Sequence, residues 1–291
     1  MKNLKNSPHP YAMLTILFWS LAFIFTKVNM QYFSAFSLGF MRYLTASLAL
    51  IVIAVRFKLK PPARRDLLLF LAAGFTGFFF YMIAFNQGTA TVTSATGSVI
   101  IATVPVLTAL FARVVYREKL RLFQWVAIGI EFAGVLILTL LDGAFSVNRG
   151  ILWLLLAALS LSTYNLLQRK LTKTYSSLQT STYSIFLGTV MLALFAPEAV
   201  RDAAKAPAVQ FVYLIVLGVG ASAIAYVSWS KAFSLAERTS QVSNYMFVTP
   251  FLTSLLAFVI AGEIPDRATL IGGGVILAGM LLYMFGDRRK A

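Results

Sequence analysis

Ten apolar blocks of about twenty residues dominate the sequence and determine the solvent that it needs. A helix of about 20 residues spans the roughly 30 Å hydrocarbon core of a membrane. Only 12% of the residues are charged, about half of the share usual in soluble domains. The pattern therefore predicts an all-α membrane protein with ten transmembrane helices and no soluble domain. The blocks run approximately over residues 11–29, 33–55, 67–87, 91–115, 122–141, 149–168, 178–196, 209–234, 238–261 and 267–286.

The lysines and arginines predict the orientation of these helices. If the N-terminus is cytoplasmic, 19 basic residues fall in cytoplasmic segments and only four in outer loops. Cytoplasmic loops are enriched in basic residues. We therefore expect a multi-pass protein of a bacterial-type inner membrane with both termini in the cytoplasm. The net charge of +15 then reflects topology and contact with lipid headgroups, and we expect no nucleic-acid partner.

The second half of the sequence repeats landmarks of the first at an offset of 145 residues. A pattern of proline, glutamate and two glycines occurs twice with the same spacing, first as Pro105, Glu118, Gly129 and Gly134 and then as Pro250, Glu263, Gly274 and Gly279. The halves, 1–145 and 146–291, each contain five predicted helices. Since five is odd, the second half enters the membrane from the opposite side. Inverted repeats of this kind are typical of secondary transporters.

These features resemble the drug/metabolite transporter superfamily in its EamA branch. The twofold pattern, an aromatic residue in the first helix of each half, Trp19 and Tyr164, and ten spans in 291 residues carry the resemblance. Within that branch the chain is most similar to the YddG type, exporters of aromatic and other amino acids. The resemblance implies a basket of helices in which spans three, four, eight and nine line a central cavity, with spans five and ten packed behind.

Aromatic and small polar side chains in these spans are the candidate substrate contacts. An aromatic-lined pocket with few polar groups suits a mostly apolar or aromatic solute, although small residues also allow close helix packing. The candidates are Trp19, Tyr81, Ser94, Ser98, Tyr164, Tyr226, Trp229, Asn244 and Tyr245.

Pro105 and Pro250 lie inside predicted spans and remove a backbone donor from each helix. We expect a break there that serves either as a hinge or as a fixed kink. Arg42 and Glu131 are ionisable residues at similar predicted depth near the membrane midplane. Such residues are costly in a membrane unless they are paired or hydrated. They are candidates for an ion pair, with proton coupling by Glu131 as an alternative.

The remaining composition argues against an enzyme. Cysteine is absent, and the single histidine, His9, precedes the first helix, so no nucleophile–base pair or metal cluster is evident at membrane depth. We expect no cofactor, and small-molecule solutes and lipids as partners. The leading hypothesis is export of aromatic and other mainly neutral amino acids by alternating access. Efflux of drugs or other metabolites, and a nontransporting assembly or sensor protein, are the alternatives.

Overall fold

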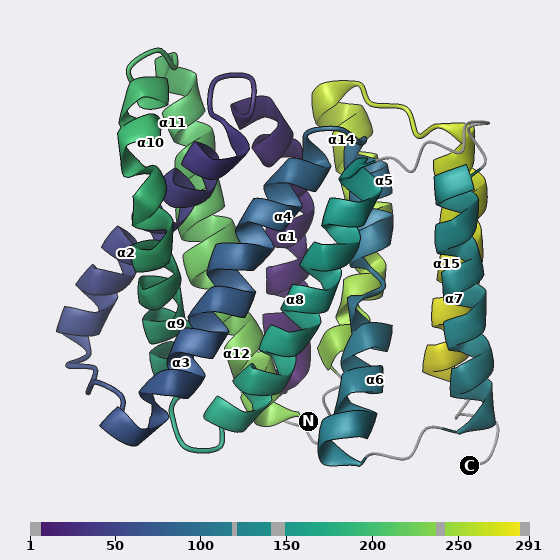
Figure 1. The fold of residues 1–291 in the computed structure, drawn as a ribbon, viewed down its shortest axis with the longest axis horizontal. Coiled ribbons are helices and arrows are strands. Elements are labelled where there is room, and N and C mark those ends of the chain that lie inside the picture. The colour runs from purple at the N-terminus through teal and green to yellow at the C-terminus, as the bar shows by residue number, and fades with distance from the viewer. Residues whose placement is uncertain (1–6, 118–120, 141–148, 237–241, 286–291) are drawn as a thin grey trace.

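A computed structural model describes residues 7–117, 121–140, 149–236 and 242–285, and this part of the chain is helical without any β-strand (Figure 1). The helices of residues 7–140 are α1 (Pro8–Asn29), α2 (Ala35–Arg56), η2 (Arg64–Asp66), α3 (Leu67–Gly74), η3 (Phe75–Phe79), α4 (Phe80–Thr89), α5 (Ser94–Ile101), α6 (Val104–Tyr116) and α7 (Leu122–Leu140). Those that follow are α8 (Arg149–Leu171), α9 (Ser177–Leu192), η4 (Ala193–Phe195), α10 (Ala196–Ala203), α11 (Ala208–Ile215), η5 (Val216–Ile224), α12 (Ala225–Leu235), η6 (Asn244–Val248), α14 (Thr249–Ala261) and α15 (Arg267–Phe285).

Single helices, or consecutive helices joined end to end, form segments that are long and apolar enough to cross a membrane. Within the described residues there are seven of these: Pro8–Asn29, Ala35–Arg56, Arg64–Thr89, Ser94–Tyr116, Arg149–Leu171, Ser177–Ala203 and Ala208–Leu235. Three shorter apolar stretches, Leu122–Gly134, Thr249–Ala261 and Thr269–Leu282, lie where further spans are predicted. The protein is therefore a multi-pass membrane protein, and a total of ten spans stays a prediction.

Local sequence explains where several helices begin and end. Ser34 precedes α2 and its hydroxyl accepts a hydrogen bond from the Ser37 backbone, and Ser176 and Gln179 form a reciprocal capping box at the start of α9. Such caps satisfy backbone N–H groups that have no partner within the helix. Directly after the C-terminal end of α14, Gly262 adopts a φ of 65°, which glycine tolerates without steric cost.

The boundaries of the helices recur at the offset found in the sequence. Adding 145 to the bounds of α6 gives those of α14, and adding it to the bounds of α7 gives those of α15. The π-helical segment η3 likewise falls within η5 at this offset. Two stretches of different sequence thus form the same succession of helices, including the same irregular turns.

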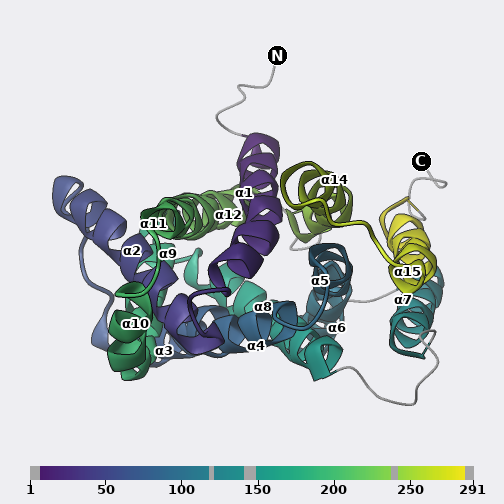
Figure 2. The same cartoon turned by 90° about the horizontal axis from the view of Figure 1, so that it is seen from above.

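The first helix of each sequence half packs mainly against helices of the other half. α1 contacts α12, η5 and α14, whereas α8 contacts α4, α6 and α5. Seen from above, α1 lies between α12 and α14 (Figure 2). α7 and α15 pack along each other at one side of the bundle (Figure 1).

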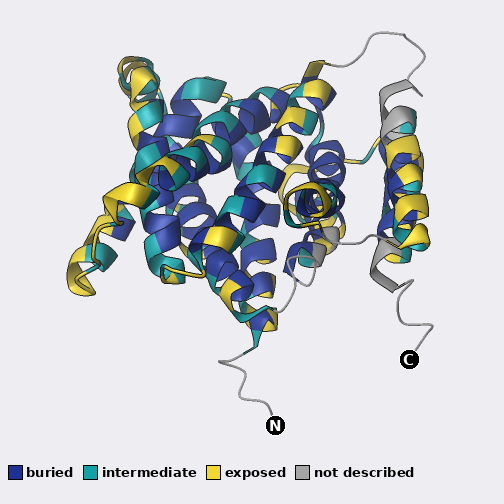
Figure 3. Ribbon diagram, turned by 60° about the horizontal axis from the view of Figure 1, so that its bottom comes forward, coloured by how far each residue is buried: buried dark blue, intermediate teal, exposed yellow. Residues whose placement is uncertain are grey.

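The outside of the bundle is apolar as well as the inside. Buried residues face neighbouring helices and exposed residues cover the periphery (Figure 3). Large apolar side chains are among the most exposed, for example Leu68 at 76% and Val114 at 80%. Lipid is the solvent that accommodates such a surface, because polar groups are not needed to solvate it.

Candidate functional site

A small cavity lies where α1, α2, α4, α5, α8 and the η6–α14 junction meet. Its volume is about 20 Å³, which is room for roughly one water molecule. A solute the size of an amino acid therefore requires these helices to move apart. The eighth predicted span, which the resemblance placed at the cavity, contributes none of its lining, whereas α1, α2 and α8 do. The lining residues are Trp19, Ala22, Phe23, Arg42, Tyr81, Phe85, Ile101, Leu161, Met246 and Thr249.

Arg42 brings a positive charge to this cavity. Its side chain is buried, with 3% of the residue exposed. Nε donates a hydrogen bond to Ser222 Oγ at 2.8 Å, and Nη2 donates to the Ala221 carbonyl at 3.5 Å. No carboxylate in the described part of the chain forms an ion pair with it. The guanidinium is thus held by neutral acceptors at the edge of an aromatic cavity, with its charge uncompensated.

The candidate ion pair between Arg42 and Glu131 is not formed in the structure. Glu131 is buried on α7, and neither carboxylate oxygen has a hydrogen-bond partner within the described residues. Similar depth fixes the position of a residue along the membrane normal and leaves its position in the membrane plane open. α2 packs against α9 and η5, whereas α7 packs against α15, so the two side chains lie in different parts of the bundle.

The predicted aromatic candidates divide into residues at the cavity and residues behind it. Trp19 and Tyr81 line the cavity. Tyr226 and Trp229 do not, but their rings pack on Trp19 with centroid separations of 5.1 and 4.9 Å. Tyr164 is fully buried against Tyr226 at 5.9 Å. These three residues form an aromatic cluster that supports Trp19.

Three of the remaining candidates, Ser94, Ser98 and Tyr245, lie away from the cavity lining. Ser94 contacts Glu263 at the end of α14, and the Ser98 hydroxyl donates to the Ala95 carbonyl of its own helix at 2.7 Å. Tyr245 shares a hydrogen bond with His9, near the start of α1. The backbone of Asn244 begins η6, but its side chain lies outside the described residues, as does Glu118.

Pro105 and Pro250 lie in the first turn of the second helix of an interrupted pair. α5 ends at Ile101 and α6 begins at Val104, and η6 passes into α14 at Thr249. Proline is tolerated in the first turn of a helix because its missing N–H would have no partner there. The predicted breaks are present at both positions; whether they move stays a prediction.

A contact among three helices lies at the face of the bundle at which α1 ends. Lys27 Nζ lies 3.0 Å from Glu263 Oε1. Glu263 also accepts hydrogen bonds from the Ser94 backbone N–H at 2.9 Å and from the Ser94 hydroxyl at 3.2 Å. One carboxylate thus joins the end of α1, the end of α14 and the start of α5. We name Lys27, Glu263 and Ser94 the far-face contact.

Breaking the far-face contact is expected to open the cavity more often. Hydrogen bonds to a charged group contribute roughly 1.5–3 kcal/mol each, so Glu263→Gln should raise the open population by about tenfold. Because the natural chain has no cysteine, Met246→Cys places a single thiol in the cavity lining. The measurement is the rate at which a maleimide labels this thiol in the purified protein.

Glu198→Gln on α10 is the control, because it removes a carboxylate that is not part of the contact. Equal labelling rates for Glu263→Gln and for its parent would show that the far-face contact does not limit access to the cavity.

Comparison with known proteins identifies the family. The model of the EamA-like transporter family matches this chain twice, over residues 7–140 and over residues 148–285. The chain belongs to the EamA-like transporter family. The family and the relatives of this chain are described as transporters, which agrees with the prediction that the protein is not an enzyme.

Individual relatives of this EamA-family protein are transporters of different descriptions. An uncharacterized transporter, YdfC of Bacillus subtilis, is 30% identical over 92% of this chain and 87% of its own length. A probable terminal-alkyne amino-acid exporter of Streptantibioticus cattleyicolor is 29% identical over 96% and 94%. An S-adenosylmethionine uptake transporter of Rickettsia prowazekii is 26% identical over 73% and 70%. One crystal structure has a TM-score of 0.69 at 18% identity, covering 97% of this chain and 98% of the other, and shows that the fold is shared.

Sequence reasoning missed several residues of the EamA-family site. Phe23, Phe85 and Met246 line the cavity but look like ordinary core residues in an apolar sequence. Lys27 could have been identified from the sequence, because a lysine inside a predicted span is costly unless it has a partner. Glu263 was identified only as a landmark of the repeat, and its contact with Lys27 depends on how α1 and α14 pack.

Proposed function

We propose that this EamA-family transporter exports amino acids, aromatic and other mainly neutral ones, by alternating access through the central cavity. The uncompensated Arg42 guanidinium beside aromatic rings carries the proposal. Arginine matches the planar geometry of a carboxylate and binds it through paired hydrogen bonds. The carboxylate of an amino acid would supply the negative charge that the described protein residues do not.

The rest of an aromatic amino acid also finds partners among the lining residues. The buried Thr249 hydroxyl has no hydrogen-bond partner within the described residues, so it is an available acceptor for an ammonium group. Tyr81 and Phe85 stack with a centroid separation of 5.6 Å, and such rings attract both a cation and another aromatic ring. The cavity thus offers one group for each part of the zwitterion.

The side of the membrane at which the far-face contact lies follows from the proposed topology. We place the protein in a bacterial-type inner membrane with ten spans, both termini in the cytoplasm, and the halves 1–145 and 146–291 in inverted orientation. The basic residues of the predicted loops and the helix bounds that recur at an offset of 145 support this arrangement. The far-face contact is then the outer closure, and the breaks at Pro105 and Pro250 are the hinges that release it.

Proton coupling is not part of the proposal. None of the described residues that line the central cavity is acidic, and Glu131 lies on α7 away from it. Facilitated transport that follows the solute gradient fits this lining.

Removing the ring of Tyr81 is expected to slow transport of aromatic amino acids selectively. An aromatic pair contributes about 0.5–1.5 kcal/mol, so Tyr81→Leu should lower L-phenylalanine flux roughly threefold to tenfold relative to L-leucine flux. The measurement is uptake of both labelled amino acids by proteoliposomes, with and without a pH gradient. Phe251→Leu is the matched control, because Phe251 is 61% exposed on the periphery. Absence of flux of any amino acid in intact vesicles would contradict the proposed substrate class.

Efflux of a drug or of another metabolite is the second candidate. One relative is described as an S-adenosylmethionine uptake transporter. Its description gives a different solute and the opposite direction of transport. A solute without a carboxylate has no use for Arg42, so a panel that includes carboxyl-free amines and nucleosides separates the two candidates.

A further inference from the structure

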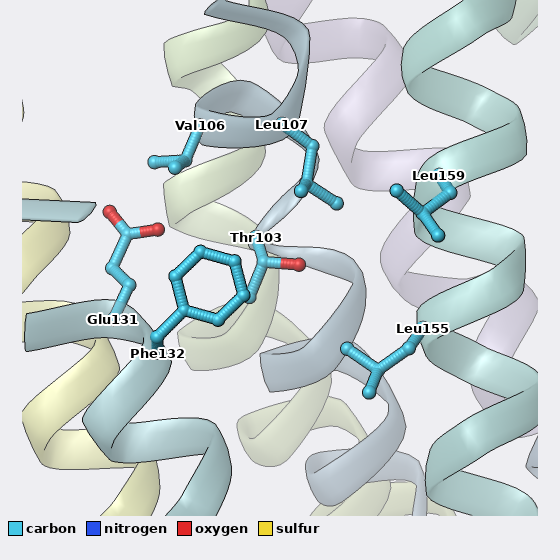
Figure 4. Close-up of a pocket in the computed structure, with 7 residues that line it drawn as sticks. All are labelled: Thr103, Val106, Leu107, Glu131, Phe132, Leu155 and Leu159. Atoms are coloured by element: carbon cyan, nitrogen blue, oxygen red, sulfur yellow. The ribbon is translucent and has the colours of Figure 1, made fainter. Parts of the chain in front are cut away.

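A second cavity lies between α6, α7 and α8, apart from the central one. Its volume is about 190 Å³, somewhat more than an apolar cavity of about 150 Å³ that binds benzene. Phe132 and Leu159, at 50% and 39% exposure, lie where α7 and α8 face the lipid, so the cavity opens toward the membrane. We name it the side cavity. Its lining residues are Thr103, Val106, Leu107, Glu131, Phe132, Leu155 and Leu159 (Figure 4).

Among the described residues that line the side cavity, Glu131 is the one ionisable group. Only 2% of the residue is exposed, and both carboxylate oxygens are without a hydrogen-bond partner in the described part of the chain. The hydroxyl of Thr103, the other polar residue in the described lining, donates to the Ile100 carbonyl at 2.7 Å. A carboxylate in apolar surroundings is strongly disfavoured, so the group either takes up a proton or is joined by a cation.

The packing of α15 holds the Glu131 side chain in this position. A Cβ added to Gly279 would lie 2.8 Å from Glu131 Cγ, so α15 presses directly on the stem of the side chain. Glu131 of α7 and Val106 of α6 both line the side cavity (Figure 4). The bundle therefore holds an acceptor for a cation at one end of an apolar chamber.

We propose that the side cavity binds a small organic amine, with its ammonium group at Glu131 and its apolar body among Val106, Leu107, Leu155 and Leu159. The ring of Phe132, next to Glu131, contributes a face that also attracts a cation. An amine with one aromatic ring matches the volume. Such amines partition into membranes and would enter between α7 and α8 without passing through the central cavity.

Equilibrium binding of labelled benzylamine to the purified full-length protein in lipid nanodiscs tests this site. Saturable binding is expected, with affinity lowered at least tenfold by Glu131→Gln. Benzyl alcohol, which has the same ring without the charge, should compete at least tenfold more weakly than unlabelled benzylamine. Excess L-phenylalanine should not displace the amine, because the central cavity is separate. Binding that persists in Glu131→Gln, or displacement by L-phenylalanine, would overturn the proposal.

A second variant leaves Glu131 in place. Leu159→Trp fills the mouth of the side cavity from α8, at a position that already faces lipid, and should abolish benzylamine binding. Leu152→Trp, two turns away on the same side of α8 and 48% exposed, is its control and should bind as the natural protein does. Equal binding by the two tryptophan variants would place the amine elsewhere.

Discussion

Arg42→Met is expected to reduce transport of L-phenylalanine by about 10- to 100-fold. The substitution removes charge-assisted hydrogen bonds to the substrate carboxylate, which contribute roughly 1.5–3 kcal/mol each, and each 1.4 kcal/mol corresponds to about a tenfold change. Arg42→Lys retains the charge but loses the planar fork, so its flux should lie between those of the natural protein and Arg42→Met. The measurement is initial uptake into proteoliposomes.

The same substitution is not expected to destabilise the fold. The guanidinium has no carboxylate partner among the described residues, and replacing a buried charge by an apolar side chain of similar length is often neutral or stabilising. The unfolding temperature of Arg42→Met should therefore equal or exceed that of the natural protein. Arg56→Met, at the exposed end of the same helix, is the control for transport. A fully active Arg42→Met protein would exclude a role for Arg42 in binding substrate.

Gly134→Ala is expected to destabilise the protein, whereas Gly129→Ala is not. A Cβ at Gly134 would lie 2.8 Å from the Gly272 carbonyl oxygen and 2.5 Å from Ile276 Cγ1, both on α15. At Gly129 the added methyl group meets nothing within 4 Å. Overpacking costs about 1–3 kcal/mol, while alanine favours a helix over glycine by up to about 1 kcal/mol. The two variants should thus shift the free energy of unfolding in opposite directions.

Thermal unfolding followed by tryptophan fluorescence, in one detergent for both variants, measures the difference. Gly274→Ala provides a second control on α15, since its methyl group also meets nothing within 4 Å. If Gly134→Ala and Gly129→Ala unfolded at the same temperature, the close approach of α7 and α15 would be refuted as a source of stability.

These glycines also show how far a sequence pattern can be followed. Gly129 and Gly134 recur at the same spacing as Gly274 and Gly279, but only Gly134 and Gly279 lie where α7 and α15 approach closely. Residues five apart on a helix differ by about 140° around its axis, so one pair can face the seam while the other faces outward. The pattern identified the helices that meet and left open which of their faces do so.

Membrane spans and helix breaks were predictable because each depends on local chemistry. Apolar length determines a span, and proline disrupts a helix wherever it falls; Pro105 and Pro250 accordingly lie at observed breaks. The cavity was less predictable, because an aromatic residue in a membrane helix can face lipid, core or solute with the same local sequence. Trp19 and Tyr81 line the cavity. Their counterparts 145 residues later, Tyr164 and Tyr226, are buried behind it.

The crossed packing of α1 and α8 limits what can move as a rigid body. α1 is seated among α12, η5 and α14, and α8 among α4, α5 and α6. A motion that separated residues 1–145 from residues 146–291 would break the contacts of both helices with the opposite half and expose buried surface on each. The mechanical units of this protein must therefore be mixed, each assembled from helices of both sequence halves.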